Sequence, residues 1–228
     1  MRSIIMPVAS AASGGAERVS ELAKRSVVGL LLMALALGAS VLGGYFFAVL
    51  VAAAAAMMFQ EWTRMLRGWG MPWLIAGFAY ALIPALALLW IRERGEHGLL
   101  LLLWVFIVTW ATDIGAYAAG RTIGGPKLAP AFSPNKTWAG LIGGVIAAAL
   151  LAAAWATTFG FSPLMLWLAP LFAVGAQVGD LLESGLKRRA GVKDSGTWLP
   201  GHGGALDRLD GLVVVATLTA LIDLQGWA

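Results

Sequence analysis

Cysteine is absent from this sequence, histidine occurs only twice, and charged residues are scarce. Without cysteine the chain has no disulfide, no thiolate nucleophile and no cysteine-ligated metal. Charged residues make up 12% of the 228 positions and hydrophobic residues 60%, whereas soluble domains carry about 25% and about 45–50%. This composition is a poor fit to a soluble enzyme, a disordered tail, a coiled coil or a nucleic-acid-binding module. It predicts an integral membrane protein with no nucleic-acid partner.

Long stretches without charge predict an all-α, polytopic membrane protein of about seven transmembrane helices. Because about 20 residues cross a bilayer, the 35 uncharged residues 26–60 are too many for one span, and Gly43-Gly44 is the expected break. Residues 137–179 need a similar break, which the segment 159–163 supplies. The predicted spans are 26–42, 45–60, 68–91, 99–119, 138–158, 164–182 and 206–224.

The basic residues predict the orientation of these spans. If the N-terminus lies in the cytoplasm, 14 of the 16 Lys and Arg residues lie on the cytoplasmic side, and only Arg92 and Arg94 lie outside. Residues 1–25 have no long apolar core before their charges, so no signal peptide is expected. They are predicted to form a cytoplasmic tail or a short interfacial helix. Residues 26–228 are expected to form a single transmembrane domain.

Polar residues concentrate in the segment 180–210, which holds ten of the 28 charged residues. If the sixth helix continues past residue 182, its polar positions share one face. These positions are Asp180, Glu183, Ser184 and Lys187. In the seventh helix Asp207 and Asp210 are spaced i, i+3 and face the same way.

Carboxylates of this density at helix ends suit a hard cation such as Mg²⁺, which takes oxygen ligands and usually also holds phosphates. The neighbouring lysines and arginines suit a polyanion, and the glycines at 201, 203 and 204 allow the backbone to approach a phosphate. The alternative is an ordinary cytoplasmic loop whose charges are solvated. The expense of acids at membrane depth favours a binding site.

A second polar cluster begins late in the fourth apolar segment. Asp113 is followed on the same helical face by Tyr117 and Arg121. An acid at this depth indicates a functional site. The alternative is a carboxylate satisfied by a hydroxyl or an arginine of a neighbouring helix.

The loop after this cluster leads into the fifth predicted helix. Ser133 stands before a proline, which predicts Ser133 as the N-cap of that helix. A helix N-terminus that carries Lys136 and Thr137 is also a ready anion site. Gly140 and Gly144 form a small-xxx-small pair, which is typical of helix packing in membranes.

Four segments with fixed spacing resemble the signature of phosphatidate cytidylyltransferases, also called CDP-diacylglycerol synthases. They are Ser184-Gly-Leu-Lys-Arg, Lys193-Asp-Ser-Gly, Leu199-Pro-Gly-His-Gly-Gly and Leu206-Asp-Arg-Leu-Asp. Two earlier segments also resemble the family, namely Asp113-Ile-Gly-Ala-Tyr-Ala-Ala-Gly-Arg and Ser133-Pro-Asn-Lys-Thr-Trp-Ala-Gly. The sequence departs from the family pattern at Asn135, where Lys is usual, and at Ala139, where Glu is usual.

The resemblance implies an enzyme that transfers the cytidylyl group of CTP to phosphatidate, giving CDP-diacylglycerol and pyrophosphate with Mg²⁺ as cofactor. It implies that residues 26–228 are the catalytic domain, in contact with membrane lipids of a bacterial-type inner (plasma) membrane. The site is expected at the cytoplasmic side, in a polar cavity among the fourth, sixth and seventh helices. A second, monovalent cation and a homodimer are further expectations.

Individual roles follow from the same resemblance. The expected metal ligands are Asp180, Asp207 and Asp210. The expected catalytic residues are Asp207, Asp210, Lys193, Lys187 and Arg208. The expected substrate- and phosphate-binding residues are Ser133, Lys136, Thr137, Ser184, Arg188, His202, Gly203, Gly204 and Asp113. For His202, a purely structural place in the turn is the alternative.

Two other functions remain as alternatives. An ion-coupled transporter would use Asp113 and Asp180 as an ion path. A CDP-alcohol phosphotransferase would carry Asp-Gly-x-x-Ala-Arg followed by spaced acids, and the sequence contains no such string. Conversion of CTP with release of pyrophosphate distinguishes the enzyme from the transporter.

Overall fold

Each of the seven predicted segments falls on a helix. The computed structural model describes residues 27–196, 198 and 203–226, so the predicted tail 1–25 lies outside the described residues. The helices within these residues are Val27–Leu42, α2 (Gly44–Met65), α3 (Met71–Arg92), α4 (Glu96–Thr122), α5 (Trp138–Thr158), α6 (Pro163–Arg189) and α7 (Leu206–Leu224). The continuation of α6 to Arg189 puts the polar positions from Asp180 to Lys187 on one helix, as expected.

Five of the described helices, α2 to α6, are long and apolar enough to cross a membrane. Their outer faces are apolar, with large exposed side chains such as Phe46 on α2, Ile75 on α3 and Trp167 on α6. The helix Val27–Leu42 is apolar but shorter, and α7 carries four charged residues. The chain is therefore a mostly helical integral membrane protein, whereas seven spans and a cytoplasmic N-terminus stay predictions.

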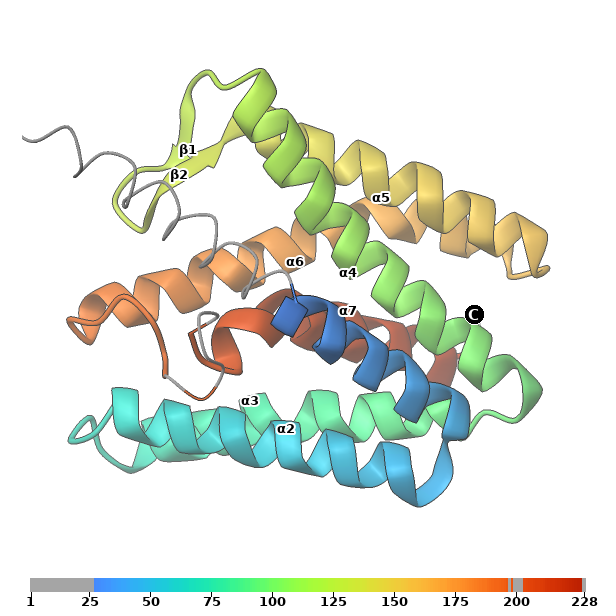
Figure 1. Cartoon of the computed structure of the whole chain (residues 1–228), viewed down its shortest axis with the longest axis horizontal. Coiled ribbons are helices and arrows are strands. Elements are labelled where there is room, and N and C mark those ends of the chain that lie inside the picture. Colours follow the sequence, from blue (N-terminus) through green and yellow to red (C-terminus); the bar gives the residue numbers. More distant parts are fainter. Residues whose placement is uncertain (1–26, 197, 199–202, 227–228) are drawn as a thin grey trace, which may run out of the picture.

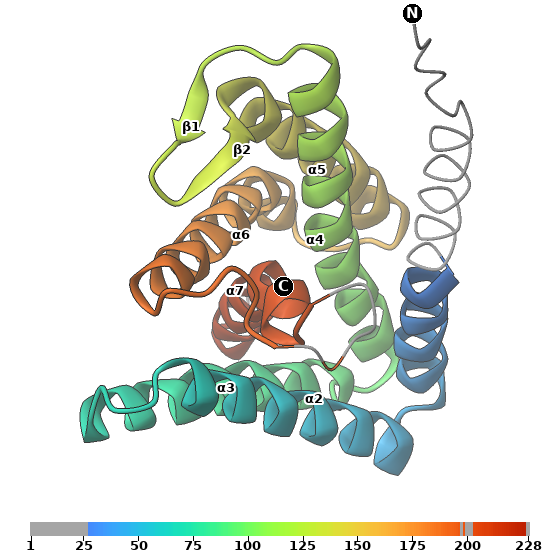
Figure 2. The same ribbon diagram turned by 60° about the vertical axis from the view of Figure 1, so that its left-hand side comes forward.

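The helices α2 to α6 form two groups with α7 between them (Figure 1 and Figure 2). On one side α2 and α3 lie alongside each other, and on the other side α4, α5 and α6 pack together. Because α7 contacts α2, α3, α4 and α6, it occupies the centre of the bundle. Buried Trp104 on α4, Phe172 on α6 and Val215 on α7 belong to one apolar core.

Glycine permits two local features that shape the bundle. Gly43 and Gly44 have φ of 64° and 50°, which allows the predicted turn between Val27–Leu42 and α2. Between α4 and α5 the backbones approach closely, because a Cβ on Gly144 would lie 2.7 Å from the carbonyl oxygen of Thr112. The packing role predicted for the glycines of α5 is thereby confirmed.

A two-stranded hairpin precedes α5 and corrects one prediction. The strands β1 (Lys127–Ala129) and β2 (Ser133–Thr137) pair antiparallel, with Ser133 opposite Ala129. The N-cap of α5 is therefore Thr137, whose Oγ1 accepts a hydrogen bond from the Gly140 N–H at 3.0 Å. Ser133 was the wrong choice for the cap because the residues that follow it continue in extended pairing rather than in helix.

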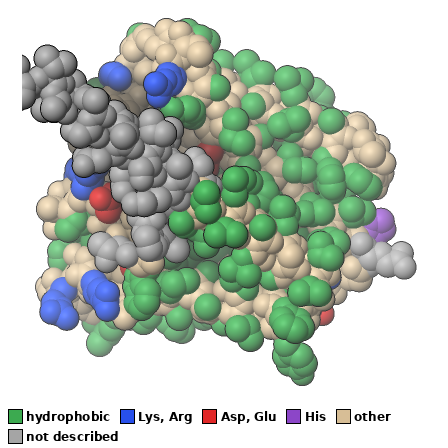
Figure 3. All heavy atoms as spheres, in the orientation of Figure 1, with side chains coloured by type: hydrophobic (Ala, Val, Ile, Leu, Met, Phe, Trp, Pro, Cys, Tyr) green, Lys and Arg blue, Asp and Glu red, His purple; other side chains and the backbone are tan. Residues whose placement is uncertain are grey.

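The loops at one end of the bundle carry most of the basic residues. At this end α2 meets α3, α4 leads into the hairpin, and α6 ends before α7 begins. Lys and Arg side chains gather at the same end in the space-filling view (Figure 3). Arg92 and Arg94 belong to the connection between α3 and α4 at the opposite end.

Candidate active site

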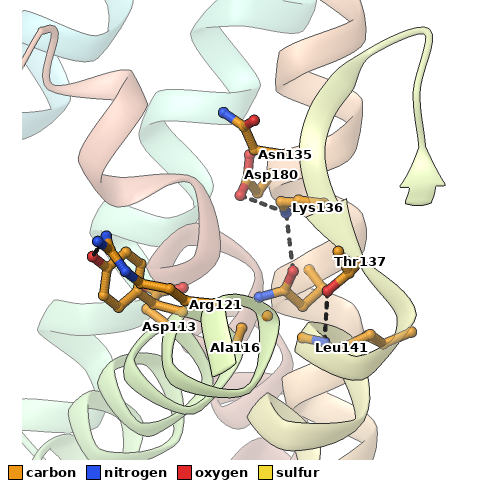
Figure 4. Close-up of a pocket in the computed structure, with 12 residues that line it drawn as sticks. Asp113, Ala116, Arg121, Asn135, Lys136, Thr137, Leu141 and Asp180 are labelled. Atoms are coloured by element: carbon orange, nitrogen blue, oxygen red, sulfur yellow. Dashed lines mark hydrogen bonds and ion pairs between the residues drawn. The ribbon is translucent and has the colours of Figure 1, made fainter. Parts of the chain in front are cut away.

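A cavity of about 520 Å³ opens at the basic end of the bundle (Figure 4). Residues of α4, β2, α5 and α6 line it. Its polar lining residues are Asp113, Tyr117, Arg121, Asn135, Lys136, Thr137, Gln177 and Asp180. All of them except Gln177 lie in the polar segments identified from the sequence.

Lys136 connects the hairpin to α6 on the wall of this cavity. Its Nζ lies 2.5 Å from Asp180 Oδ2 and donates to Gln177 Oε1 at 3.0 Å. Ser184 Oγ donates to the other oxygen of Asp180 at 3.2 Å. The lysine ammonium group therefore lies among side-chain oxygens, as a bound cation would.

The wall formed by α4 carries the predicted polar face. Asp113, Tyr117 and Arg121 all line the cavity. Arg121 Nη1 donates to the Tyr117 hydroxyl at 2.8 Å, and its guanidinium carbon lies 5.9 Å from the ring centroid. The negative charge of Asp180 and the positive charge of Lys136 both act on Asp113. Asp113 thus belongs to the same charged group as the Lys136–Asp180 pair.

A second lysine–aspartate pair lies where α6 ends and α7 begins. Lys187 Nζ donates to Asp207 Oδ1 at 2.6 Å and to Glu183 Oε1 at 3.1 Å. The side chains of Lys187 and Asp207 are each only 10% exposed. Ion pairs that are this well shielded hold their geometry much better than surface pairs do.

Asp207 is also fixed by the backbone. Its Oδ2 accepts hydrogen bonds from the N–H groups of Ser195 at 2.9 Å and Gly204 at 2.8 Å. Together with Lys187, these N–H groups give the buried Asp207 carboxylate three hydrogen-bond donors. Asp207 is therefore an anchored carboxylate.

Glu61 on α2 is a buried carboxylate that sequence reasoning missed. It is fully buried, and it accepts hydrogen bonds from Ser195 Oγ at 3.0 Å and from the N–H groups of Ala205 and Leu206 at 2.9 Å each. These donors are 134 to 145 residues away in the chain. The available signal was an acid directly after the uncharged run 26–60, which is also consistent with an ordinary helix end.

Asp210, Tyr80 and Glu183 are three further polar residues inside the bundle. Asp210 Oδ1 accepts from the Gly211 N–H at 2.7 Å, and the negative charges of Asp180 and Glu183 act on it. Tyr80 Oη and Glu183 Oε2 are buried and have no hydrogen-bond partner among the described residues. Buried polar atoms are normally paired, so these two atoms are exceptions.

The three predicted metal ligands do not form one close group. In the described part of the chain, three or more His, Asp or Glu side chains nowhere gather closely enough to hold a metal ion. Instead Asp180 contacts Lys136, and Asp207 contacts Lys187. Metal binding by these residues therefore stays a prediction.

The predicted lining of the cavity needs a correction. α4 and α6 do line it, but the described residues of α7 do not, and β2 and α5 take its place. The reason is that the hairpin brings Lys136 against α6. Asp207, in contrast, binds Lys187. Lys187 lies about two helical turns beyond Asp180 on α6.

The remaining predicted residues lie around these two pairs. Arg188 is exposed, and its Nε donates to the carbonyl oxygen of Phe132 in the hairpin at 3.3 Å. Lys193 and Arg208 are also exposed. Gly203 has φ of 79° and lies in the turn before Asp207. His202 lies outside the described residues.

Comparison with known proteins decides the family. The profile of the cytidylyltransferase family matches residues 68–224, which is more than half of the chain. The chain belongs to the cytidylyltransferase family. It is similar to the phosphatidate cytidylyltransferase of Brucella suis biovar 1 (strain 1330), with 47% identity over 176 residues that cover 75% of this chain and 63% of the relative. It is also similar to the phosphatidate cytidylyltransferase of Rickettsia bellii (strain RML369-C), with 35% identity over 190 residues that cover 78% of this chain and 80% of the relative.

The cytidylyltransferase match includes both lysine–aspartate pairs and the cavity. The chain spans just under two thirds, 63%, of the length of the Brucella relatives that it matches. Glu61 lies before the matched range, although its carboxylate binds Ser195, Ala205 and Leu206 inside it.

Proposed function

We propose that this protein transfers the cytidylyl group of CTP to phosphatidate and releases pyrophosphate and CDP-diacylglycerol. The observation that carries the proposal is the place of the signature residues. In a chain 47% identical to a phosphatidate cytidylyltransferase, they form two lysine–aspartate pairs at the basic end of an apolar helix bundle. A polyanionic nucleotide and a lipid phosphate both suit such a place.

The residues present fit Mg²⁺ as the cofactor. Mg²⁺ is usually held by one or two carboxylates together with waters and substrate phosphates, so it needs no cage of three acids. Asp180 and Asp210 supply hard oxygen ligands, and the unpaired Glu183 Oε2 lies in the same polar region. Asp207 Oδ1 accepts a hydrogen bond from Lys187 and keeps a second lone pair. When bound, the ion would neutralise phosphate charge and polarise the reacting phosphoryl group. A second, monovalent cation remains part of the proposal.

The reaction needs no protein nucleophile. An oxygen of the phosphatidate phosphate attacks the α-phosphorus of CTP, the bond from that phosphorus to the bridging oxygen breaks, and pyrophosphate leaves with the electron pair. What the protein must supply is alignment and neutralisation of charge. Lys136 and Arg121 on the cavity wall, and Lys187 beside Asp207, are the cations that the described residues offer for this purpose.

The ion pairs would rearrange when substrate arrives. A triphosphate carries more charge than one carboxylate, so Lys136 would move from Asp180 to a phosphate oxygen. This exchange leaves an Asp180 oxygen for the cation that accompanies the nucleotide. Lys187 is more deeply shielded and bonded to two carboxylates, so we assign it to holding Asp207 in place while its third N–H contacts phosphate.

The membrane arrangement suits one water-soluble and one lipid substrate. The basic end of the bundle would face the cytoplasm by the positive-inside rule, so that CTP reaches the cavity from water. Phosphatidate would keep its acyl chains against the apolar outer faces of the helices. In this arrangement the protein lies in a bacterial inner membrane, and a homodimer is compatible with it.

A direct assay tests the proposal. The full chain, purified in detergent, is mixed with CTP, phosphatidate and MgCl₂, and pyrophosphate and CDP-diacylglycerol are measured. We expect equal amounts of both products and no product when either substrate or Mg²⁺ is omitted. Folded protein that forms neither product would overturn the proposal. Ion flux into vesicles that needs Asp113 and Asp180 but not CTP would favour the transporter instead.

A further inference from the structure

Glu61 has no role in the proposed reaction, but it contacts residues that hold Asp207. Its carboxylate is completely buried, and a buried charge is unfavourable unless hydrogen bonds compensate it. Three donors do so, namely Ser195 Oγ and the N–H groups of Ala205 and Leu206. The two N–H groups lie at the start of α7, where no side chain of the helix's own N-cap satisfies the first-turn donors. Glu61 therefore caps α7 from a different helix.

The loop residues that Glu61 binds also hold Asp207. Ser195 donates through its hydroxyl to Glu61 and through its backbone N–H to Asp207. Gly204 donates to Asp207, and the next residue, Ala205, donates to Glu61. The two carboxylates thus bind the same two short segments, and any shift of these segments away from Glu61 moves the donors of Asp207.

Two glycines show that this contact tolerates no extra atom. A Cβ added at Gly196 would collide with the Glu61 carboxylate, and one added at Gly204 would collide with Glu61 and with Ser195 Oγ. Gly196 has no positive φ in the structure, and the three atoms nearest to a Cβ there all belong to Glu61. Shape and hydrogen bonding therefore both fit Glu61 to this loop.

We propose that Glu61 is a positioning residue that sets the place of Asp207 through Ser195 and the turn before α7. It does not touch substrate. This inference rests on the proposed function for its effect on turnover, but its effect on the loop can be measured without turnover. Because Glu61 acts through Asp207, its loss should lower kcat and weaken the response to Mg²⁺, and it should leave the KM for CTP nearly unchanged.

The test compares Glu61→Gln with the matched variant Glu93→Gln in the full chain in detergent. Glu93 is an exposed acid at the C-cap of α3, at the opposite end of the bundle. Glutamine keeps the size of Glu61. It replaces one accepting oxygen with an NH₂ group, which then faces a donor. Amide hydrogen exchange is measured over residues 195–196 and 203–206 and over α4, and kcat, the KM for CTP and the half-saturating Mg²⁺ concentration are measured on folded protein.

For Glu61→Gln we expect at least tenfold faster exchange in 195–196 and 203–206 with unchanged exchange in α4. We also expect kcat at least tenfold lower, a raised Mg²⁺ requirement, and a KM for CTP within threefold of the original chain. Glu93→Gln should change none of these. Unchanged exchange in 195–196 and 203–206 overturns the proposal, and so does faster exchange with unaltered kcat. If the original chain itself makes no pyrophosphate, the proposed function fails, and the exchange data still judge whether Glu61 holds the loop.

A second variant guards against a folding defect in Glu61→Gln. Ser195→Ala removes one donor to Glu61 and leaves the backbone N–H that binds Asp207. We expect the same pattern of changes at smaller size, and Glu61→Gln should add less in the Ser195→Ala background than alone. Fully additive effects of the two substitutions would contradict a shared path to Asp207.

Discussion

Lys136 Nζ lies 2.5 Å from Asp180 Oδ2, and this contact brings the hairpin β1–β2 against α6. The second pair, Lys187 with Asp207, repeats the arrangement at the junction of α6 and α7. Each pair joins two segments that are far apart in the chain. Two of the three acids proposed as metal ligands therefore already have a positive partner, which a metal–nucleotide complex would have to displace or share.

Replacement of Lys136 tests the role of the first pair. Lys136→Gln removes the charge that would pass from Asp180 to the nucleotide phosphates. We expect the KM for CTP to rise and kcat/KM to fall at least tenfold, measured as pyrophosphate release over a range of CTP concentrations.

Lys127→Gln is the matched control for this prediction. Lys127 is an exposed residue of the same hairpin and is absent from the cavity wall. Its kinetics should stay within twofold of the original chain. Equal kinetics for Lys136→Gln and Lys127→Gln would show that the Lys136–Asp180 contact has no part in nucleotide binding.

Replacement of Asp207 tests the second pair. Asp207→Asn keeps the size of the side chain but removes the charge that binds Lys187 and two backbone N–H groups. We expect Mg²⁺-dependent pyrophosphate release to fall to the background of the assay. Asp223→Asn, the same substitution at the other end of α7, should keep turnover per folded molecule. Normal turnover by Asp207→Asn in detergent would refute the proposed metal-ligand role.

The sequence was sufficient for the helices, and its polar segments contain most of the polar residues that line the cavity. Runs without charge predict the helices because a bilayer interior excludes charge. The i, i+7 spacing of Asp180 and Lys187 predicts that both lie on one face of α6. Glu61 could not be assigned, because its partners are more than 130 residues away and only the packing of α2 against α7 brings them together. The lining of the cavity was missed in part for a similar reason. β2 contacts α6 because it belongs to a hairpin, and its five residues Ser133–Thr137, which include a proline, did not predict a strand.

The close approach of α4 and α5 gives a prediction about stability. Gly144→Ala would place its Cβ against the Thr112 carbonyl oxygen and the Ala116 Cβ. Because overpacking of this kind costs about 1–3 kcal/mol, we expect a lower midpoint of thermal unfolding in detergent. Gly38→Ala is the control, since no described atom lies within 4 Å of a Cβ at that position. If the midpoints of Gly144→Ala and Gly38→Ala are equal, α4 and α5 accommodate the extra methyl group without loss of stability.

Asp223 gives the last prediction, at the end of the bundle farthest from the proposed site. Its side chain is 10% exposed, and its Oδ2 accepts from Trp90 Nε1 and from Arg94 Nε at 2.8 Å each. Asp223→Asn removes the negative charge that binds Trp90 and Arg94. Since hydrogen bonds to a charged group are worth about 1.5–3 kcal/mol, we expect a lower thermal midpoint with unchanged turnover per folded molecule. Loss of turnover in a fully folded Asp223→Asn preparation would instead show that this end of α7 communicates with the two lysine–aspartate pairs.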